Sequence, residues 1–110
     1  MGYRILITEF DVNDIGTPSS SSSRDNAVAD VYKRILNVAL DEPATCALVT
    51  WGLSDGDSWY NKGDNRSNIR GDGTPQRPLL FDPDFKPKPA LQALVDALSH
   101  APTRPLPPKA

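Results

Sequence analysis

Two carboxylates, Glu9 and Asp11, stand where a short apolar run ends. Ile5, Leu6 and Ile7 are consecutive and apolar, which is typical of a strand covered on both faces in a parallel sheet. Because side chains alternate along a strand, Ile7, Glu9 and Asp11 should share one face. A carboxylate beside buried isoleucines is costly unless it is paired, hydrogen-bonded or used in a reaction. The spacing alone leaves two interpretations open, a structural Glu that caps a loop or pairs with a distant Arg and a catalytic Glu, and it favours the first.

Two tryptophans are the other candidate groups. Trp51 ends a second apolar run, Thr45–Trp51, and Trp59 lies in the loop that follows. In a β/α barrel the catalytic groups lie at the C-terminal ends of the strands, so Glu9 and Trp51 would face the lumen together. A carboxylate beside an indole is typical of sugar sites, because pyranose rings stack on aromatic faces and carboxylates bind hydroxyls or attack the anomeric carbon. A Trp at a strand end is nevertheless more often a packing residue.

The overall composition excludes several classes of function. The 110 residues carry a formal net charge of −2, mixed along the chain, which does not suggest a protein that binds nucleic acid or a membrane surface. The single Cys46 excludes an internal disulfide and a Cys-based zinc site, and His100 is alone, so we expect no metal site and no cofactor. No apolar run could span a bilayer, and acids follow the first apolar run directly, so no secretory leader is expected.

The hydrophobic pattern predicts two helices in addition to the two strands. The first helix has Asp25 as its N-cap and runs to about Leu40, before Pro43. Its apolar face is formed by Val28, Val31, Tyr32, Ile35, Leu36 and Ala39. The second helix begins near Pro89, which suits a first helical turn. Its apolar face is formed by Leu91, Leu94, Val95 and Leu98.

Three stretches lack a periodic pattern. The segment 13–23 is rich in Asn, Gly, Pro and Ser, and its run Ser19–Ser23 is predicted to be a flexible surface loop. The segment 52–77 is a loop long enough to be functional or disordered, and it contains the aromatic pair Trp59-Tyr60. Residues 101–110 include four prolines and are predicted to form a disordered tail.

The order strand, helix, strand, helix predicts an α/β chain with a parallel sheet. Two parallel strands cannot close a barrel, and a complete β/α barrel needs roughly 200 residues or more. The chain therefore reads as part of something larger, which in isolation would expose strand edges and an apolar sheet face.

Four linked motifs resemble the C-terminal part of glycoside hydrolase family 10, the endo-1,4-β-xylanases. They are Ile7–Val12, Thr50–Asp55 with Asp57–Trp59, Arg77–Asp82 and Phe85–Ala90, in the family's order and at its separations. The resemblance runs from Met1 to about Leu98 and implies that residues 1–100 form the last two β/α units of a TIM (β/α)8 barrel, which is incomplete in this chain. Met1-Gly2 falls just before what would be the seventh strand, as in a truncated or mis-started reading frame.

The resemblance also implies roles for individual residues. Glu9 matches the nucleophile of a retaining, double-displacement hydrolysis, and Asp11 matches an acid that supports it through hydrogen bonds. Trp51 and Trp59 match the two tryptophans that enclose the sugar next to the scissile bond. The substrate would be xylan or a xylo-oligosaccharide.

Four further matching residues are expected to be structural. Asp55 should order its loop, while Arg77, Asp82 and Lys88 should anchor the final loop and helix. The family's acid/base Glu and the His that positions the nucleophile lie on earlier strands and are not in this chain. Glu42 cannot replace that acid, because it stands at the opposite end of the second strand.

The resemblance therefore implies a glycoside hydrolase fragment of the endo-1,4-β-xylanase type that carries the nucleophile half of the active site. Alone it should not hydrolyse xylan, and the partner that the resemblance implies is an N-terminal barrel fragment. The alternatives are a non-catalytic carbohydrate-binding remnant and the structural half of a split barrel. Members of the family are commonly secreted or periplasmic, but this sequence does not specify a compartment.

Overall fold

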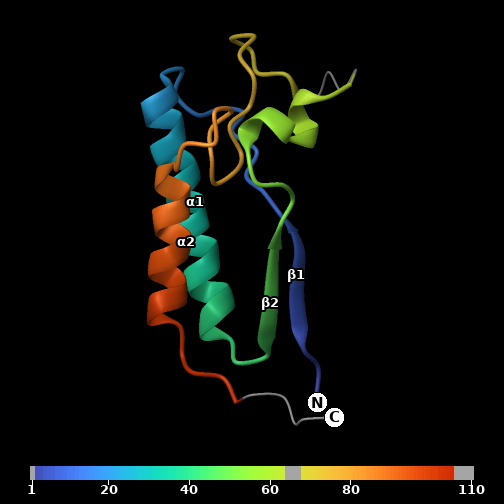
Figure 1. The fold of residues 1–110 in the computed structure, drawn as a ribbon, viewed down its shortest axis with the longest axis vertical. Coiled ribbons are helices and arrows are strands. Elements are labelled where there is room, and N and C mark those ends of the chain that lie inside the picture. The colour runs from blue at the N-terminus through green and yellow to red at the C-terminus, as the bar shows by residue number, and fades with distance from the viewer. Residues whose placement is uncertain (1, 64–67, 106–110) are drawn as a thin grey trace.

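The computed structural model describes residues 2–63 and 68–105, and it contains two consecutive β/α units (Figure 1). The main elements in chain order are β1 (Ile5–Phe10), α1 (Ser21–Asp41), β2 (Thr45–Thr50) and α2 (Pro89–His100). Two short 3-10 turns, η1 (Asp55–Asp57) and η2 (Trp59–Asn61), follow β2. β1 and β2 pair in parallel, as the sequence pattern predicts. The α/β architecture is confirmed; the described chain is a two-stranded piece and not a closed barrel.

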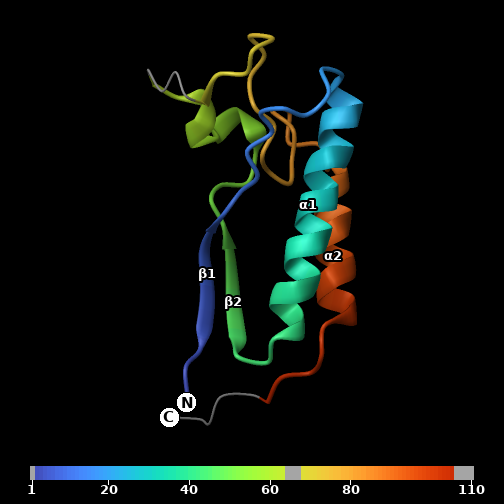
Figure 2. The same cartoon turned by 180° about the vertical axis from the view of Figure 1, so that it is seen from behind.

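Both helices lie on the same side of the sheet and run back from the end where the strands finish (Figures 1 and 2). Phe10 and Leu48 point from the strands into the core between sheet and helices. On the strands Leu6 is 58% exposed and Val49 is 52% exposed. The prediction of strands covered on both faces is therefore wrong for the described chain, because the helices cover one face only.

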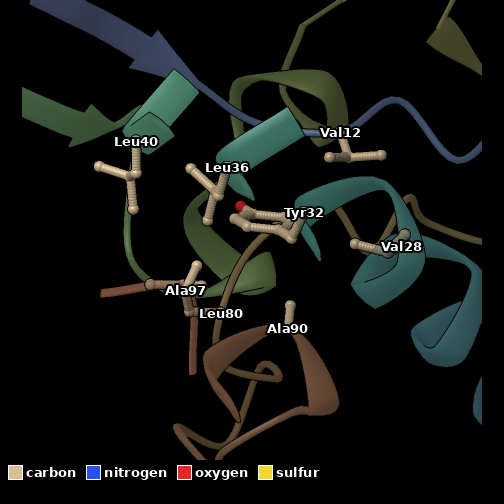
Figure 3. Close-up of a cluster of buried hydrophobic side chains, with 8 residues drawn as sticks. All are labelled: Val12, Val28, Tyr32, Leu36, Leu40, Leu80, Ala90 and Ala97. Atoms are coloured by element: carbon tan, nitrogen blue, oxygen red, sulfur yellow. The ribbon is translucent and has the colours of Figure 1, made fainter. Parts of the chain in front are cut away.

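The core is a cluster centred on α1 (Figure 3). Val28, Tyr32 and Leu36 are fully buried, as the helical spacing predicts. The ring of Phe10 meets Tyr32 edge-on, with centroids 4.8 Å apart and planes at 84°. The Tyr32 hydroxyl donates to the carbonyl of Pro78 at 3.1 Å, so the buried phenol is satisfied. By contrast, Ile35, also assigned to the apolar face, is exposed.

The α2 helix buries smaller residues than predicted. Ala90 and Ala97 are its buried positions, whereas Val95 and Leu98, both assigned to the apolar face, are about half exposed. Because α2 packs against α1 as well as against the loop before it, small side chains allow close approach of the two helices. Leu91 is nevertheless partly buried against the core, so the predicted face is correct in part.

The start of α1 also differs from the prediction. Ser20 is the N-cap, and its Oγ accepts a hydrogen bond from the backbone N–H of Ser23 at 3.3 Å. The Ser-rich segment therefore supplies the first helical turn and not only a loop. Asp25 lies inside the helix, where its carboxylate binds Arg77 at 2.7 Å. An ion pair with a residue 52 positions away, invisible to local spacing, explains the wrong N-cap.

The described part of the tail is tied to the end of the sheet where β2 begins. Arg104 donates to the carbonyl oxygens of Leu40 and Thr45, each at 2.6 Å, and to that of Glu42 at 3.0 Å. The predicted tail spans 101–110, of which 106–110 lie outside the described residues, so its disorder stays a prediction. In the part of the chain that the structure describes, no helix is long and apolar enough to cross a membrane.

Candidate functional site

The four residues singled out in the sequence line one pocket. Glu9, Asp11, Trp51 and Trp59 surround a hollow of about 250 Å³ beyond the C-terminal ends of the two strands. The backbone N–H of Trp51 donates to the carbonyl of Phe10 at 2.9 Å, which continues the parallel pairing past β2. This bond places Trp51, which directly follows β2, in the same pocket as Glu9 on β1. Alternation along β1 also directs Glu9 and Asp11 toward the pocket. The pairing of β1 with β2 is irregular between Ile7 and Phe10, the stretch that contains Glu9.

Glu9 is exposed. Because it directly precedes Phe10, which packs against the core, alternation places Glu9 on the sheet face that the helices leave uncovered. Within residues 2–63 and 68–105, no hydrogen bond or ion pair engages its carboxylate. The interpretation of Glu9 as the partner of a distant Arg therefore finds no support in the described residues. Trp51 and Trp59 are 46% and 43% exposed, so each presents ring surface to solvent. A free carboxylate between two accessible indoles can accept hydroxyl hydrogen bonds and can act as a nucleophile.

Asp11 is engaged differently from Glu9. Its Oδ2 accepts a hydrogen bond from Nε1 of Trp59 at 2.8 Å, and its Oδ1 accepts one from the hydroxyl of Tyr60 at 3.2 Å. The two rings stack on each other, with centroids 4.4 Å apart and planes at 29°. Burial, followed by the charge of Asp11, raises the pKa of Tyr60 to about 12. Asp11 thus holds an aromatic pair at the pocket wall.

Tyr60 is a residue that sequence reasoning did not assign to the site. The aromatic pair was visible in the sequence, but it stands in a loop without any periodic pattern. Only the turn at η2 brings its hydroxyl back to Asp11, a residue 49 positions earlier. A hydrogen bond across that separation has no local signature.

The loop that carries Trp59 is anchored at several points. Ser58 is fully buried, and its Oγ accepts from the backbone N–H of Tyr60 at 3.2 Å. The amide of Asn61 donates to the carbonyls of Asp55 and Gln76 at 3.1 and 2.9 Å. These contacts make η2 a fixed support for the indole of Trp59.

Asp55 ties the loop after β2 to the segment before α2, which confirms the loop-ordering role predicted for it. It is almost fully buried and accepts from the backbone N–H of Leu79 at 2.9 Å. The ammonium of Lys88 lies 2.9 Å from its Oδ2. Burial raises the pKa of Asp55, and the hydrogen bond and charge of Lys88 oppose that rise. The predicted structural roles of Lys88 and of Arg77, which pairs with Asp25, are confirmed by these contacts.

Asp82 also has a structural role, as the sequence predicts. Its Oδ1 accepts from the backbone N–H groups of Asp84 and Lys86, each at 2.9 Å. The bond from Lys86 lowers the pKa of Asp82. The turn places Phe85 at φ 59°, a left-handed conformation that costs a non-glycine residue energy. The chain thereby turns toward Lys88 and the start of α2.

A second buried network, which sequence reasoning missed, supports the loop after β1. Asp14 is fully buried and lies 2.6 Å from Nη2 of Arg24. Arg70 reaches the same carboxylate at 3.3 Å, and the backbone N–H of Arg77 donates to it at 3.0 Å. The network joins the segment after β1 to the start of α1 and to the loop before α2. Asp14 stands in the segment 13–23, which has no periodic pattern, so nothing in its sequence neighbourhood indicates burial.

No metal centre is evident at the pocket. Across the residues that the structure describes, no group of three or more His, Cys, Asp or Glu side chains could hold a metal ion.

Comparison with known proteins gives one consistent set of matches. A family model described as "Glycosyl hydrolase family 10" matches residues 1–97. Endo-1,4-beta-xylanase B of Thermotoga neapolitana is 34% identical over 102 residues, which are 91% of this chain and 26% of that protein. Endo-1,4-beta-xylanase A of Cellvibrio japonicus is 38% identical over 71 residues, which are 62% of this chain and 10% of that protein.

Solved structures agree with the sequence matches. Native xylanase 10B of Thermotoga maritima superposes with a TM-score of 0.71 at 32% identity, over 87% of this chain and 27% of that one. Xylanase 10B of Thermotoga petrophila, solved in complex with xylobiose, gives 0.71 at 33% identity over 89% and 27%. The chain thus spans about a quarter of the length of these proteins.

Proposed function

Because the chain belongs to glycosyl hydrolase family 10, we propose that it supplies the nucleophile half of a retaining β-1,4-xylanase site. The single observation that carries this proposal is the pocket lined by Glu9, Asp11, Trp51 and Trp59. The proposed ligand is a xylo-oligosaccharide or a xylan chain. The structure of a relative with xylobiose supports this choice of sugar.

The walls of the pocket suit a sugar ring. Trp51 and Trp59 each keep a large part of their ring surface open to solvent, and such surfaces bind the C–H faces of pyranoses. A volume of about 250 Å³ lies below the range of roughly 300–1,000 Å³ that is usual for drug-sized ligands. The pocket is therefore proposed to hold one sugar unit of a longer chain.

In the proposed reaction, the carboxylate of Glu9 attacks the anomeric carbon of the bound unit and forms a glycosyl ester. The glycosidic C–O bond breaks at the same time, and its oxygen takes a proton from a second carboxyl group. Water, deprotonated by that second group, then hydrolyses the ester and frees Glu9. The absence of a bound partner at Glu9 in the described residues supports its assignment as the attacking group.

Asp11 is poorly suited to be the second carboxyl group. Both of its oxygens accept hydrogen bonds from the aromatic rings of Trp59 and Tyr60. A general acid must donate a proton to the leaving oxygen, and both oxygens of Asp11 are already used as acceptors within the pocket wall. We therefore assign Asp11 to support of the pocket and expect the acid/base group to come from polypeptide other than the described residues. General acid assistance is commonly worth about 10²- to 10⁴-fold, so the chain alone should be nearly inactive.

A second candidate function is to complete a barrel with another polypeptide. Val49 alternates with the core residue Leu48, so it lies on the sheet face opposite the helices, where it is 52% exposed. In a complete β/α barrel this face would point into the barrel interior, and the two open edges of the sheet would pair with strands of the remaining units. The proposed partner is accordingly a polypeptide with about six β/α units, the number that a barrel of eight would still need.

The decisive experiment mixes this chain with the N-terminal three quarters of a full-length relative and measures release of an aryl alcohol from an aryl β-xyloside. Glu9→Gln is expected to abolish release. Glu42→Gln is the matched control, because Glu42 lies at the opposite end of β2 and its Oε1 can still accept from Ala44 as Gln. Release that persists in the Glu9→Gln mixture contradicts the nucleophile assignment. Binding of xylotriose without any release in the mixture favours a carbohydrate-binding role.

A further inference from the structure

The contacts of Asp11 give a role to a residue that does not itself line the pocket. We infer that Tyr60 is a positioning residue: together with Asp11 it fixes the indole of Trp59 and thereby sets the shape of the sugar pocket. The inference rests on the proposed function, because the fixed wall would act on a bound xylo-oligosaccharide.

One carboxylate holds both rings of the aromatic pair. Asp11 uses Oδ2 for the indole of Trp59 at 2.8 Å and Oδ1 for the hydroxyl of Tyr60 at 3.2 Å. The rings are in turn stacked, with centroids 4.4 Å apart. Carboxylate, indole and phenol therefore form a closed set of three contacts. Rotation of either ring breaks a hydrogen bond to Asp11 or the stack between the rings.

The indole of Trp59 needs such support because it is 43% exposed and lacks the packing that fixes a core side chain. With one hydrogen bond alone, the indole could pivot about Nε1. Tyr60 covers one face of the indole, so the pocket is lined by the opposite face or by the ring edge. This geometry makes the orientation of Trp59 depend on the hydroxyl of Tyr60.

Tyr60 is itself well placed to act as a support. Its backbone N–H is bound by Ser58, and the next residue, Asn61, is tied to the carbonyls of Asp55 and Gln76. The pKa of Tyr60 is raised to about 12, chiefly by burial, so its hydroxyl remains a donor throughout the neutral range. Because Tyr60 belongs to an anchored loop and stacks on Trp59, its phenol ring fixes the position of the exposed indole.

The test compares Tyr60→Phe, which keeps the stacked ring and removes only the hydroxyl, with Tyr3→Phe as the matched control. Tyr3 is an exposed tyrosine that precedes β1. In a Trp51→Phe background Trp59 is the only tryptophan, since the chain contains two. Time-resolved fluorescence anisotropy then reports the fast rotation of Trp59 without any sugar. In the chain with both tryptophans, intrinsic fluorescence titration gives the affinity for xylotriose.

Tyr60→Phe is expected to enlarge the fast anisotropy decay of Trp59 and to weaken xylotriose binding about 3- to 10-fold, the factor for one hydrogen bond. Tyr3→Phe should match its parent in both measurements, and Asp11→Asn should act in the same direction as Tyr60→Phe. Circular dichroism verifies that each variant is folded.

Unchanged rotation of Trp59 in Tyr60→Phe overturns the inference. So does faster rotation with unchanged xylotriose affinity, because the pocket would then not depend on Tyr60. If the parent chain does not bind xylotriose at all, the proposed sugar site of the isolated chain fails. The anisotropy measurement still decides separately whether Tyr60 positions Trp59.

Discussion

Arg24 donates to the carboxylate of Asp14 across 2.6 Å, and both side chains are almost completely removed from water. The pair joins the segment after β1 to the first turns of α1. Arg70 completes it from the loop before α2. The segment that follows β1 is therefore held in place by buried charges.

Replacement of Asp14 by Asn should destabilise the chain strongly. The variant keeps the size of the side chain but leaves the guanidinium groups of Arg24 and Arg70 buried without their shared carboxylate. Loss of one partner from a buried ion pair commonly costs about 3–5 kcal/mol of unfolding free energy. Urea denaturation measures the change. Lys62→Met is the control, since Lys62 and Asp57 are both more than 60% exposed and such pairs contribute about 0–1 kcal/mol. Equal losses in the two variants would contradict the importance of the buried network.

Arg104 should stabilise the C-terminal end of α1. The last turn of α1 contains no basic residue, and Arg104 supplies both a positive charge and donors to the carbonyls of Leu40 and Glu42. Arg104→Met should lower the unfolding free energy by about 1.5–3 kcal/mol, the range for hydrogen bonds that involve a charged group. The unfolding free energy of Arg104→Lys should lie between those of the parent chain and Arg104→Met, because an ammonium keeps the charge but lacks the planar set of donors. A chain truncated before residue 104 that is as stable as the full chain would refute this role.

Stability should fall in alkaline solution. The pKa of Tyr60 is raised to about 12, and burial raises the pKa of Tyr32 as well. Each folded-state pKa exceeds the unfolded value near 10, so above about pH 10 the unfolded chain releases protons that the folded chain retains. The stabilisation is complete below pH 10 and is lost as pH rises toward the folded pKa values. Urea midpoints between pH 8 and 11.5 measure the loss.

Absorbance at 295 nm provides an independent check of the alkaline prediction, because it counts tyrosinates directly. Of the three tyrosines in the chain, Tyr60 and Tyr32 should ionise well above pH 10. Asp11→Asn should lower the pKa of Tyr60 without returning it to the ordinary value, because burial, the largest cause, remains. A stability that is level from pH 9 to 11.5 would contradict the assignment.

The uncovered face of the sheet should cause self-association of the isolated chain. Val49 is 52% exposed on this face, and paired apolar strands with open edges are prone to associate. Val49→Lys should reduce the concentration dependence of the molecular mass measured by light scattering. Val38→Lys is the matched control, because Val38 is 75% exposed on α1 and away from the sheet. A monomer with a sharply cooperative thermal transition at all concentrations would rule out the prediction.

Local patterns in the sequence were sufficient for the element order and the parallel pairing. Apolar runs predict strands, and 3.6-residue spacing predicts the buried side of α1 through Val28, Tyr32 and Leu36. Local patterns were insufficient to predict the start of α1. Asp25 forms an ion pair with Arg77, and Ser20 is the N-cap. Local patterns also overestimated the burial of the large apolar residues of α2, because the small residues Ala90 and Ala97 are the ones buried at its contact with α1.

The sequence by itself determined which side chains stand at the strand ends, because alternation and strand length place Glu9 and Trp51 there in any parallel arrangement. Only the tertiary structure decided how Asp11 is used. Its partners Trp59 and Tyr60 lie almost fifty residues away, and their hydrogen bonds depend on how the loop after β2 folds back. Periodicity reports local geometry, whereas a polar contact between distant segments exists only once the intervening chain has found its path.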